Sequence, residues 1–310
     1  MIAFGSSIID AEAYRRFARP GIMRAAEQGS ELLAFEALGS ICRSNNLVLD
    51  AAAARDDLEA LVLVDQATEI ADPDFCRKAR EALSDRDVAV VGCVGATGVR
   101  TIAWWDGAVS RGPVRHRYYE HGGGELPAFA WARDVAPPGE VETVDGELMV
   151  LSPWAVRNLR FDESLNLGHG YDLDFCLQAR AAGRKVVTAD LRAVRHRSLE
   201  LVRERERDLW IEAHIRLAEK WDGRTPGGAP PTVDWKQRAR RAEAERDAAR
   251  AIAYSAASEL DARVLPLEQA MKEATESLSW RITEPLRRLN AARRRRVSTT
   301  PARAGSPPSR

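Results

Sequence analysis

Short apolar runs alternate with helical patterns along the first part of the chain, and this alternation limits the possible folds more than any other feature of the sequence. The runs have the length of strands and are rich in β-branched or other apolar residues, whereas residues 40–54 have helical spacing. Alternating strands and helices predict a mostly parallel sheet that is covered by helices. The predicted strands are residues 2–4, 31–35, 61–64 and 88–92.

Gly5, Glu36 and Asp65 each follow one of these predicted strands directly. Because ligands collect at the carboxyl ends of the strands in such sheets, these three residues are the first candidates for a binding site. A carboxylate at Asp65 could hold Mg²⁺ or Mn²⁺ against a diphosphate, since both cations prefer oxygen ligands. The alternative is that this segment only leads into a helix that Asp72 and Pro73 start.

Residues 145–198 are predicted to form a binding site as well as part of the core. Apolar spacing in the middle of this stretch indicates a helix whose first turn carries two carboxylates, Asp172 and Asp174. The free N–H groups at the start of a helix carry partial positive charge and favour such carboxylates. Gly183 is expected to end the helix before a short strand at residues 185–188. Alternatively, the two carboxylates serve only as helix caps.

The composition, with 45% apolar and 30% charged residues, is that of a soluble protein with one large domain and a smaller appendage. The four cysteines are widely separated and form no Cys-x-x-Cys pair, so they are predicted to be reduced core thiols. No apolar run approaches the about 18 residues that a membrane span needs, and the first residues lack a secretory signal. The sequence therefore predicts a cytoplasmic protein.

Charge divides the chain into two parts. Residues 236–310 carry 17 Lys and Arg against 9 Asp and Glu, so the preceding part is acidic, because the net charge of the chain is zero. Residues 226–234 are rich in Gly and Pro and are predicted to be a linker. The predicted organisation is a domain over residues 1–225, this linker, a helical basic extension over residues 235–292, and an Arg-rich disordered tail over residues 293–310.

The extension contains an apolar stripe with Trp280, which lies opposite a basic set that includes Arg281 and is followed by four arginines at 293–296. A helix of this kind lies on an anionic membrane surface. We therefore expect residues 267–296 to hold the protein peripherally at the inner face of the membrane, near a lipid-linked acceptor. The alternatives are a self-association helix or a solvated tail. The arginine tract lacks interleaved aromatic residues, which argues against nucleic acid as a partner.

The order of the polar motifs along the chain resembles that of the family-2-type inverting glycosyltransferases with a GT-A fold, and more closely a small actinobacterial branch described as glycosyltransferase-like. The resemblance spans residues 1–225 and implies a mixed, mostly parallel sheet flanked by helices. It rests on the segments Ser44-Asn45-Asn46, Asp65, Val144-Asp145-Gly146, Phe161-Asp162-Glu163, Gly170-Tyr171-Asp172-Leu173-Asp174 and Arg195-His196, which follow one another in this order.

The resemblance also implies roles for individual residues. Asp65 matches the strand-end carboxylate that binds a divalent cation, Mn²⁺ or Mg²⁺, and the sugar nucleotide; His196 matches a histidine that completes the metal shell or touches the diphosphate. Asp172 matches the general base, which takes the proton of the acceptor hydroxyl. Asp145 and Gly146 match the segment beneath the donor sugar. The implied reaction moves a sugar from a nucleoside diphosphate sugar to a glycan or lipid-linked acceptor, with inversion, as in polysaccharide biosynthesis.

Four further residues are candidate substrate contacts. Glu36 follows a strand, Asn46 lies on the helix after it, and Asp174 shares a helical turn with Asp172. Trp105 offers an aromatic face on which a sugar ring could stack. Asn46 could instead be a helix-face residue without a ligand, and Trp105 could belong to the core.

Two departures from the family pattern support a second hypothesis. Ala67 stands at the third position of the metal motif, where it cannot bind a cation, and Tyr171 precedes Asp172 in place of Glu. The alternative function is therefore a catalytically inactive, glycosyltransferase-like binding or scaffold protein. A nucleotidyltransferase on a similar sheet is disfavoured, because residues 5–8 do not supply the glycine- and lysine-rich loop that it needs.

Overall fold

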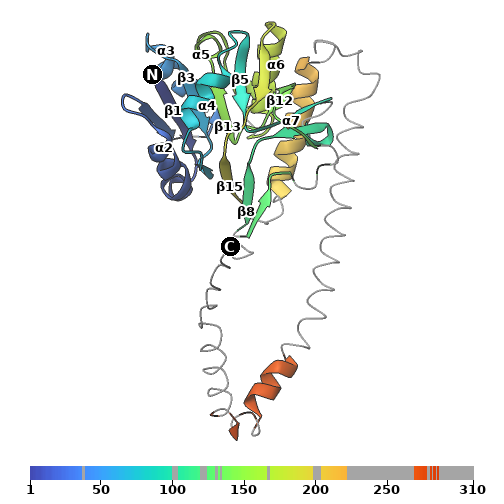
Figure 1. Cartoon of the computed structure of the whole chain (residues 1–310). Coiled ribbons are helices and arrows are strands. Elements are labelled where there is room, and N and C mark those ends of the chain that lie inside the picture. Colours follow the sequence, from blue (N-terminus) through green and yellow to red (C-terminus); the bar gives the residue numbers. More distant parts are fainter. Residues whose placement is uncertain are drawn as a thin grey trace, which may run out of the picture. The chain divides into compact units, whose positions relative to one another are not determined.

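The computed structural model (Figure 1) describes two parts of the chain, which divides into compact units at residues 1–243 and 244–310. In the first unit it describes residues 1–36, 39–99, 104–118, 124–129, 132, 135–165, 168–197 and 204–221. In the second unit it describes residues 269–277, 280, 282–283 and 285. The predicted linker at 226–234 and the predicted tail at 293–310 lie outside the described residues.

A seven-stranded mixed sheet forms the centre of the first unit, in the order β11-β14-β5-β13-β3-β1-β2. The pairs β1–β2, β1–β3 and β5–β14 are parallel, whereas β13 runs antiparallel to both β3 and β5. The predicted mixed, mostly parallel sheet is therefore confirmed. The strands are β1 (Ile2–Ile8), β2 (Glu31–Glu36), β3 (Ala60–Val64), β5 (Val88–Gly92), β11 (Glu140–Val141), β13 (Leu148–Leu151) and β14 (Lys185–Thr188).

Helices cover both faces of this sheet, because successive side chains of a strand point to opposite faces and both sets are apolar here. Ala3 and Leu61 pack in a cluster with α3 (Ile41–Ala53), α5 (Pro153–Asn158) and α6 (Tyr171–Ala181). Phe4 and Val62, the next residue of each strand, pack in a second cluster with α2 (Arg19–Ala25) and α4 (Phe75–Ala82). α1 (Ala11–Ala13) and a π-helical turn (Tyr14–Ala18) lead into α2.

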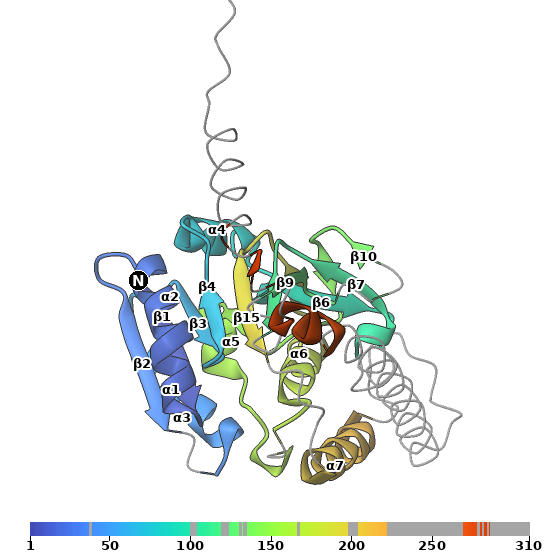
Figure 2. The same cartoon turned by 90° about the horizontal axis from the view of Figure 1, so that it is seen from below.

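Two four-stranded sheets flank the central one, and neither is evident from the sequence. The first, in the order β4-β15-β8-β9, contains β4 (Thr68–Ile70), β8 (Arg115–Tyr118), β9 (Gly124–Pro127) and β15 (Ala193–Arg197). The second contains β6 (Val94–Thr97), β7 (Ala108–Arg111), β10 (Val135–Ala136) and β12 (Thr143–Val144). Figure 2 shows β4 and β15 side by side, and their pairing brings β15 close to the end of β3.

All four cysteines are free and buried, so they lie in the core as predicted. The last helix of the first unit is α7 (Glu204–Trp221). In the second unit, residues 269–276 are helical and exposed; the rest of the predicted extension lies mostly outside the described residues. Within the described part of the chain, no helix has the length and apolar character to cross a membrane.

Candidate functional site

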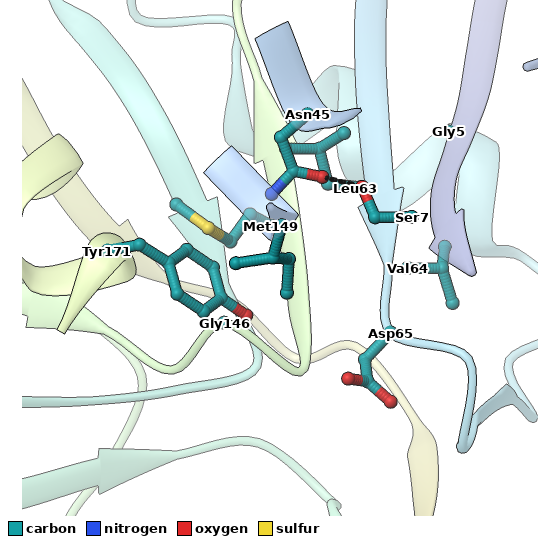
Figure 3. A pocket seen from close by; sticks show the side chains of 10 residues that line it. Gly5, Ser7, Asn45, Leu63, Val64, Asp65, Gly146, Met149 and Tyr171 are labelled. Carbon is teal, nitrogen blue, oxygen red and sulfur yellow. Dashed lines mark hydrogen bonds between the residues drawn. The ribbon is translucent and has the colours of Figure 1, made fainter. Parts of the chain in front are cut away.

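A pocket opens where β1 and β3 end and α3 begins (Figure 3). The carboxyl ends of parallel strands are the usual place for ligands in such sheets, so the pocket lies where the strand pattern predicted a site. Glu36 lies at the end of β2, where its side chain is exposed and does not line this pocket. The lining residues are Gly5, Ser7, Ile41, Asn45, Leu63, Val64, Asp65, Gly146, Met149 and Tyr171.

Asn45, and not the predicted Asn46, lines the pocket. Ser7 Oγ donates a hydrogen bond to Asn45 Oδ1, and both side chains are buried. Asn46 is held by Phe161 through two bonds: its Nδ2 donates to the Phe161 carbonyl at 2.9 Å, and its Oδ1 accepts from the Phe161 N–H at 2.9 Å. Sequence periodicity could have found Asn45, because it shares a helical face with the buried Cys42 and Val48.

Asp65 is held by an ion pair at the end of β3. Its Oδ1 pairs with Nη1 of Arg195 and accepts the N–H of Ala67 at 2.7 Å. Arg195 reaches this position from β15, and its Nε lies 3.8 Å from Oε1 of Glu147. Two segments distant in sequence thus place one guanidinium between the carboxylates of Asp65 and Glu147.

His196 does not share a site with Asp65. It follows Arg195 in β15, so the two side chains leave opposite faces of the strand. The His196 ring stacks on Phe17 with ring centroids 3.7 Å apart, and its Nε2 lies 3.1 Å from Oε2 of Glu69. Burial lowers the pKa of His196, against the opposing effect of Glu69. In the described residues, no group of three or more His, Cys, Asp or Glu could hold a metal ion.

The predicted pair Gly146 and Asp172 is in direct contact. Asp172 lies in the first turn of α6, where its Oδ2 accepts the N–H of Gly146 at 2.9 Å and its Oδ1 accepts that of Leu173 at 2.9 Å. Burial raises the pKa of Asp172, although the two N–H groups oppose the shift. Burial, together with the charge of Glu147, holds the pKa of Asp145 well above its ordinary range. Two carboxyls with raised pKa values therefore stand beside Gly146.

Gly146 is required because the ring of Tyr171 passes over it. A Cβ at this position would lie 2.6 Å from Tyr171 Oη and 3.0 Å from its Cζ. We expect Gly146→Ala to cost about 1–3 kcal/mol of unfolding free energy, since a methyl group is forced into a packed site. Thermal denaturation measures this cost. Gly139→Ala is the matched control, because its Cβ would meet no atom closer than 4.0 Å; an equal loss in both variants would contradict the packing argument.

Asp174 and Trp105, two other predicted substrate contacts, lie among protein groups. Asp174 is fully buried, where it accepts hydrogen bonds from Trp221 Nε1 at 2.8 Å and Lys220 Nζ at 3.0 Å. Trp105 stacks against Phe129, with ring centroids 6.2 Å apart. Neither residue lines the pocket. Their contacts give Asp174 a role in fixing α7 and Trp105 a role in packing.

Comparison with known proteins gives a family for this chain. The model of the family described as "Glycosyltransferase like family" matches residues 23–213. The streptomycin biosynthesis protein StrF of Streptomyces griseus is 27% identical over 200 residues, which cover 63% of this chain and 66% of StrF. The alignment with this curated relative thus takes in just under two thirds of its length.

Solved structures with a similar fold include two complexes with a nucleotide. The mannosyltransferase PcManGT from Pyrobaculum calidifontis, in complex with GDP-Man and Mn²⁺, is 16% identical, covers 91% of this chain and 81% of its own, and has a TM-score of 0.45. GalNAc-T7 with UDP, GalNAc and Mn²⁺ is 9% identical, covers 72% of this chain and 48% of its own, and has a TM-score of 0.48. Because both TM-scores are low, the assignment rests on the family model. That model covers more than half of the 310 residues, so the chain belongs to the glycosyltransferase-like family, as its motif order indicated.

Proposed function

We propose that this protein is an inverting glycosyltransferase that moves a sugar from a nucleoside diphosphate sugar to a hydroxyl group of a glycan or lipid-linked acceptor. The observation that carries the proposal is the position of the Asp172 carboxylate beside the pocket. It is fixed by the N–H of Gly146, a residue that lines the pocket at the strand ends, and burial raises its pKa. A general base works best when its pKa is brought towards the operating pH. Membership of the glycosyltransferase-like family supports the same assignment.

In the proposed reaction the donor nucleotide occupies the pocket between β1, β3 and α3, where Ser7 and Asn45 offer polar groups. Asp172 accepts the proton of the acceptor hydroxyl while the oxygen of that hydroxyl forms a bond to the anomeric carbon. The bond from that carbon to the diphosphate breaks on the opposite face, and the nucleoside diphosphate leaves with the electron pair. Positioning of the two reactants by Gly146 and Asp172 contributes to the rate by holding them in line.

A divalent cation at Asp65 and His196 does not fit this geometry. Asp65 is ion-paired with Arg195, His196 contacts Glu69 on the other face of β15, and Ala67 has no ligating atom in its side chain. The Mn²⁺ of the two solved structures belongs to those proteins. The proposed mechanism therefore has no step that passes through a metal.

The pH dependence of transfer follows from the raised pKa of Asp172. Because Asp172 acts as a base only when ionised, kcat/KM is expected to rise with pH through this pKa, so the acidic limb lies above the ordinary Asp value of 3.8. A pH–rate profile from acidic to neutral pH measures the limb. A limb at or below 3.8, with the protein folded throughout, would assign the base to another group.

The donor is identified by a thermal-shift screen with nucleoside diphosphates and nucleotide sugars, each with EDTA and with Mn²⁺. A ligand that binds only the folded state raises its stability by mass action. A shift with one nucleotide, followed by release of that nucleotide on addition of an acceptor, supports the proposal. The competing function is an inactive scaffold, which Ala67 and the replacement of Glu by Tyr171 before Asp172 favour. The absence of any shift would favour this scaffold.

For the acceptor side, we propose that residues 267–296 dock on an anionic membrane surface from the cytoplasmic side. Among the described residues of this segment, Met271, Trp280 and Ile282 are exposed apolar side chains, and the sequence adds clustered arginines. Trp280→Ser combined with Ile282→Ser is expected to weaken binding to phosphatidylglycerol vesicles about tenfold or more, since apolar burial and charge act together. Co-sedimentation measures the loss. Gln269→Ala is the control, and equal binding by both variants would refute the docking.

A further inference from the structure

Arg195 lies where the carboxylates at the end of β3 need a positive charge. We propose that its guanidinium, and not a divalent cation, balances these carboxylates and binds the diphosphate of the donor. The inference rests on the proposed function, because it names the group that receives the leaving nucleoside diphosphate. It also explains how the site can function with Ala67 in place of a second metal ligand.

The contacts of Arg195 are those of a central cation. Its Nη1 pairs with Oδ1 of Asp65 and donates to Thr68 Oγ1 at 3.2 Å, and its Nε lies 3.8 Å from Oε1 of Glu147. Asp145 is close enough for its charge to act on the same guanidinium. Any cation bound by Asp65 and Glu147 would have to displace Arg195 first.

The guanidinium retains donors for a ligand. Within the described part of the chain, Nη2 makes no hydrogen bond, and Nε is buried without a hydrogen-bond partner. About a fifth of the Arg195 side chain remains exposed, so it is not sealed in the core. An arginine fork matches the oxygens of a phosphate group and stays charged at all physiological pH values.

The position of Arg195 also fits the pocket. Asp65 lines the pocket and is the direct ion-pair partner of Arg195, so the guanidinium lies next to the wall of the pocket that Asp65 forms. A nucleotide seated between β1, β3 and α3 would therefore direct its diphosphate past Asp65 towards Arg195. The charge of the arginine offsets both the protein carboxylates and the departing diphosphate.

The test uses the full chain and two measurements. Electron paramagnetic resonance of Mn²⁺, without nucleotide, reports whether the protein binds the metal. Calorimetric titration with UDP, GDP, ADP, CDP and dTDP, in EDTA and then in Mn²⁺, reports whether nucleotide affinity needs it. The variant is Arg195→Met, which keeps the length of the side chain and removes the fork. Arg192→Met is the matched control, because Arg192 lies just before β15 with an exposed side chain.

We expect the wild type to bind no Mn²⁺ on its own and to bind its nucleotide equally well in EDTA and in Mn²⁺. Arg195→Met should lose about 10- to 100-fold in affinity, as expected for one or two charged hydrogen bonds, while Arg192→Met keeps it. Nucleotide binding that disappears in EDTA and returns with Mn²⁺ would overturn the inference and leave the proposed function standing. Unchanged affinity in a folded Arg195→Met would overturn it as well.

Two further outcomes of the test have different consequences. If no nucleotide binds the wild type in either solution, the proposed function fails, and the role of Arg195 fails with it. If Arg195→Met does not fold, Arg195→Lys replaces it: this variant keeps the charge but not the fork, so an affinity between those of wild type and background supports the inference. Affinity equal to the wild type in Arg195→Lys, together with Mn²⁺ dependence, would contradict it.

Discussion

We expect Asp172→Asn to lower kcat for sugar transfer by about 10²–10⁴-fold while the affinity for the donor nucleotide changes little, because the lost group acts on the acceptor and not on the donor. The asparagine Oδ1 can still accept the N–H of Gly146, which Asp172 accepts at 2.9 Å. The loop that contains Gly146 therefore keeps this hydrogen bond. The bond from the Leu173 N–H is lost, but that group lies in the first turn of α6, where water can replace the acceptor.

Single-turnover transfer and calorimetric nucleotide titration, made on the same preparations, separate the two effects. Asp190→Asn is the control, because Asp190 is an exposed carboxylate that pairs with Lys78 away from the pocket. A variant at Asp172 that loses nucleotide affinity as strongly as turnover would show that Asp172 positions the donor. Turnover close to that of the wild type would remove Asp172 as the base and assign that role to another group.

Much of the central sheet was predictable because its strands carry their signal locally. The runs at β1, β3 and β5 are buried, apolar and of strand length, and the run at β2 is apolar and of strand length although only Leu33 in it is buried, so the pattern alone identifies them. α6 ends at Ala181, two residues before Gly183, which has the left-handed φ of +74° that favours glycine. The two smaller sheets were not predictable, because β4 and β12 are too short to show a pattern and depend on partners far along the chain.

The candidate site also contains a part that the sequence predicted and a part that it could not predict. The motif order brought Gly146 and Asp172 to attention, and the structure places them in contact. The ion pair between Asp65 and Arg195 could not be found locally, since it depends on which face of β15 meets the end of β3, and that is set by the register with β4. A single-residue change of register would exchange Arg195 and His196 between the two faces.

The second large effect concerns Asp174. The sequence suggested it as a substrate contact, and the structure places it against the C-terminal end of α7. Its side chain is fully buried and accepts hydrogen bonds from Lys220 Nζ, Trp221 Nε1 and Gln178 Nε2 at 3.0, 2.8 and 2.7 Å. We expect Asp174→Ala to lower the free energy of unfolding by about 3 kcal/mol, the lower end for removing one partner of a buried ion pair. The lower end applies because Lys220 keeps Asp162 at 2.7 Å and is partly exposed.

For a folded unit of this size, a loss of about 3 kcal/mol corresponds to a fall in Tm of about 6–12 °C, which calorimetry resolves easily. Asp162→Ala removes the other, partly exposed partner of Lys220, so its expected cost is smaller, about 1 kcal/mol. Asp174→Asn should fall between the two, because its oxygen can still accept from Trp221. Because Asp172 lies on α6 and not on α7, loosening α7 should reduce activity only as far as it reduces the folded fraction. A variant at Asp174 that keeps its Tm but loses nucleotide affinity would instead make Asp174 the substrate contact that the sequence suggested.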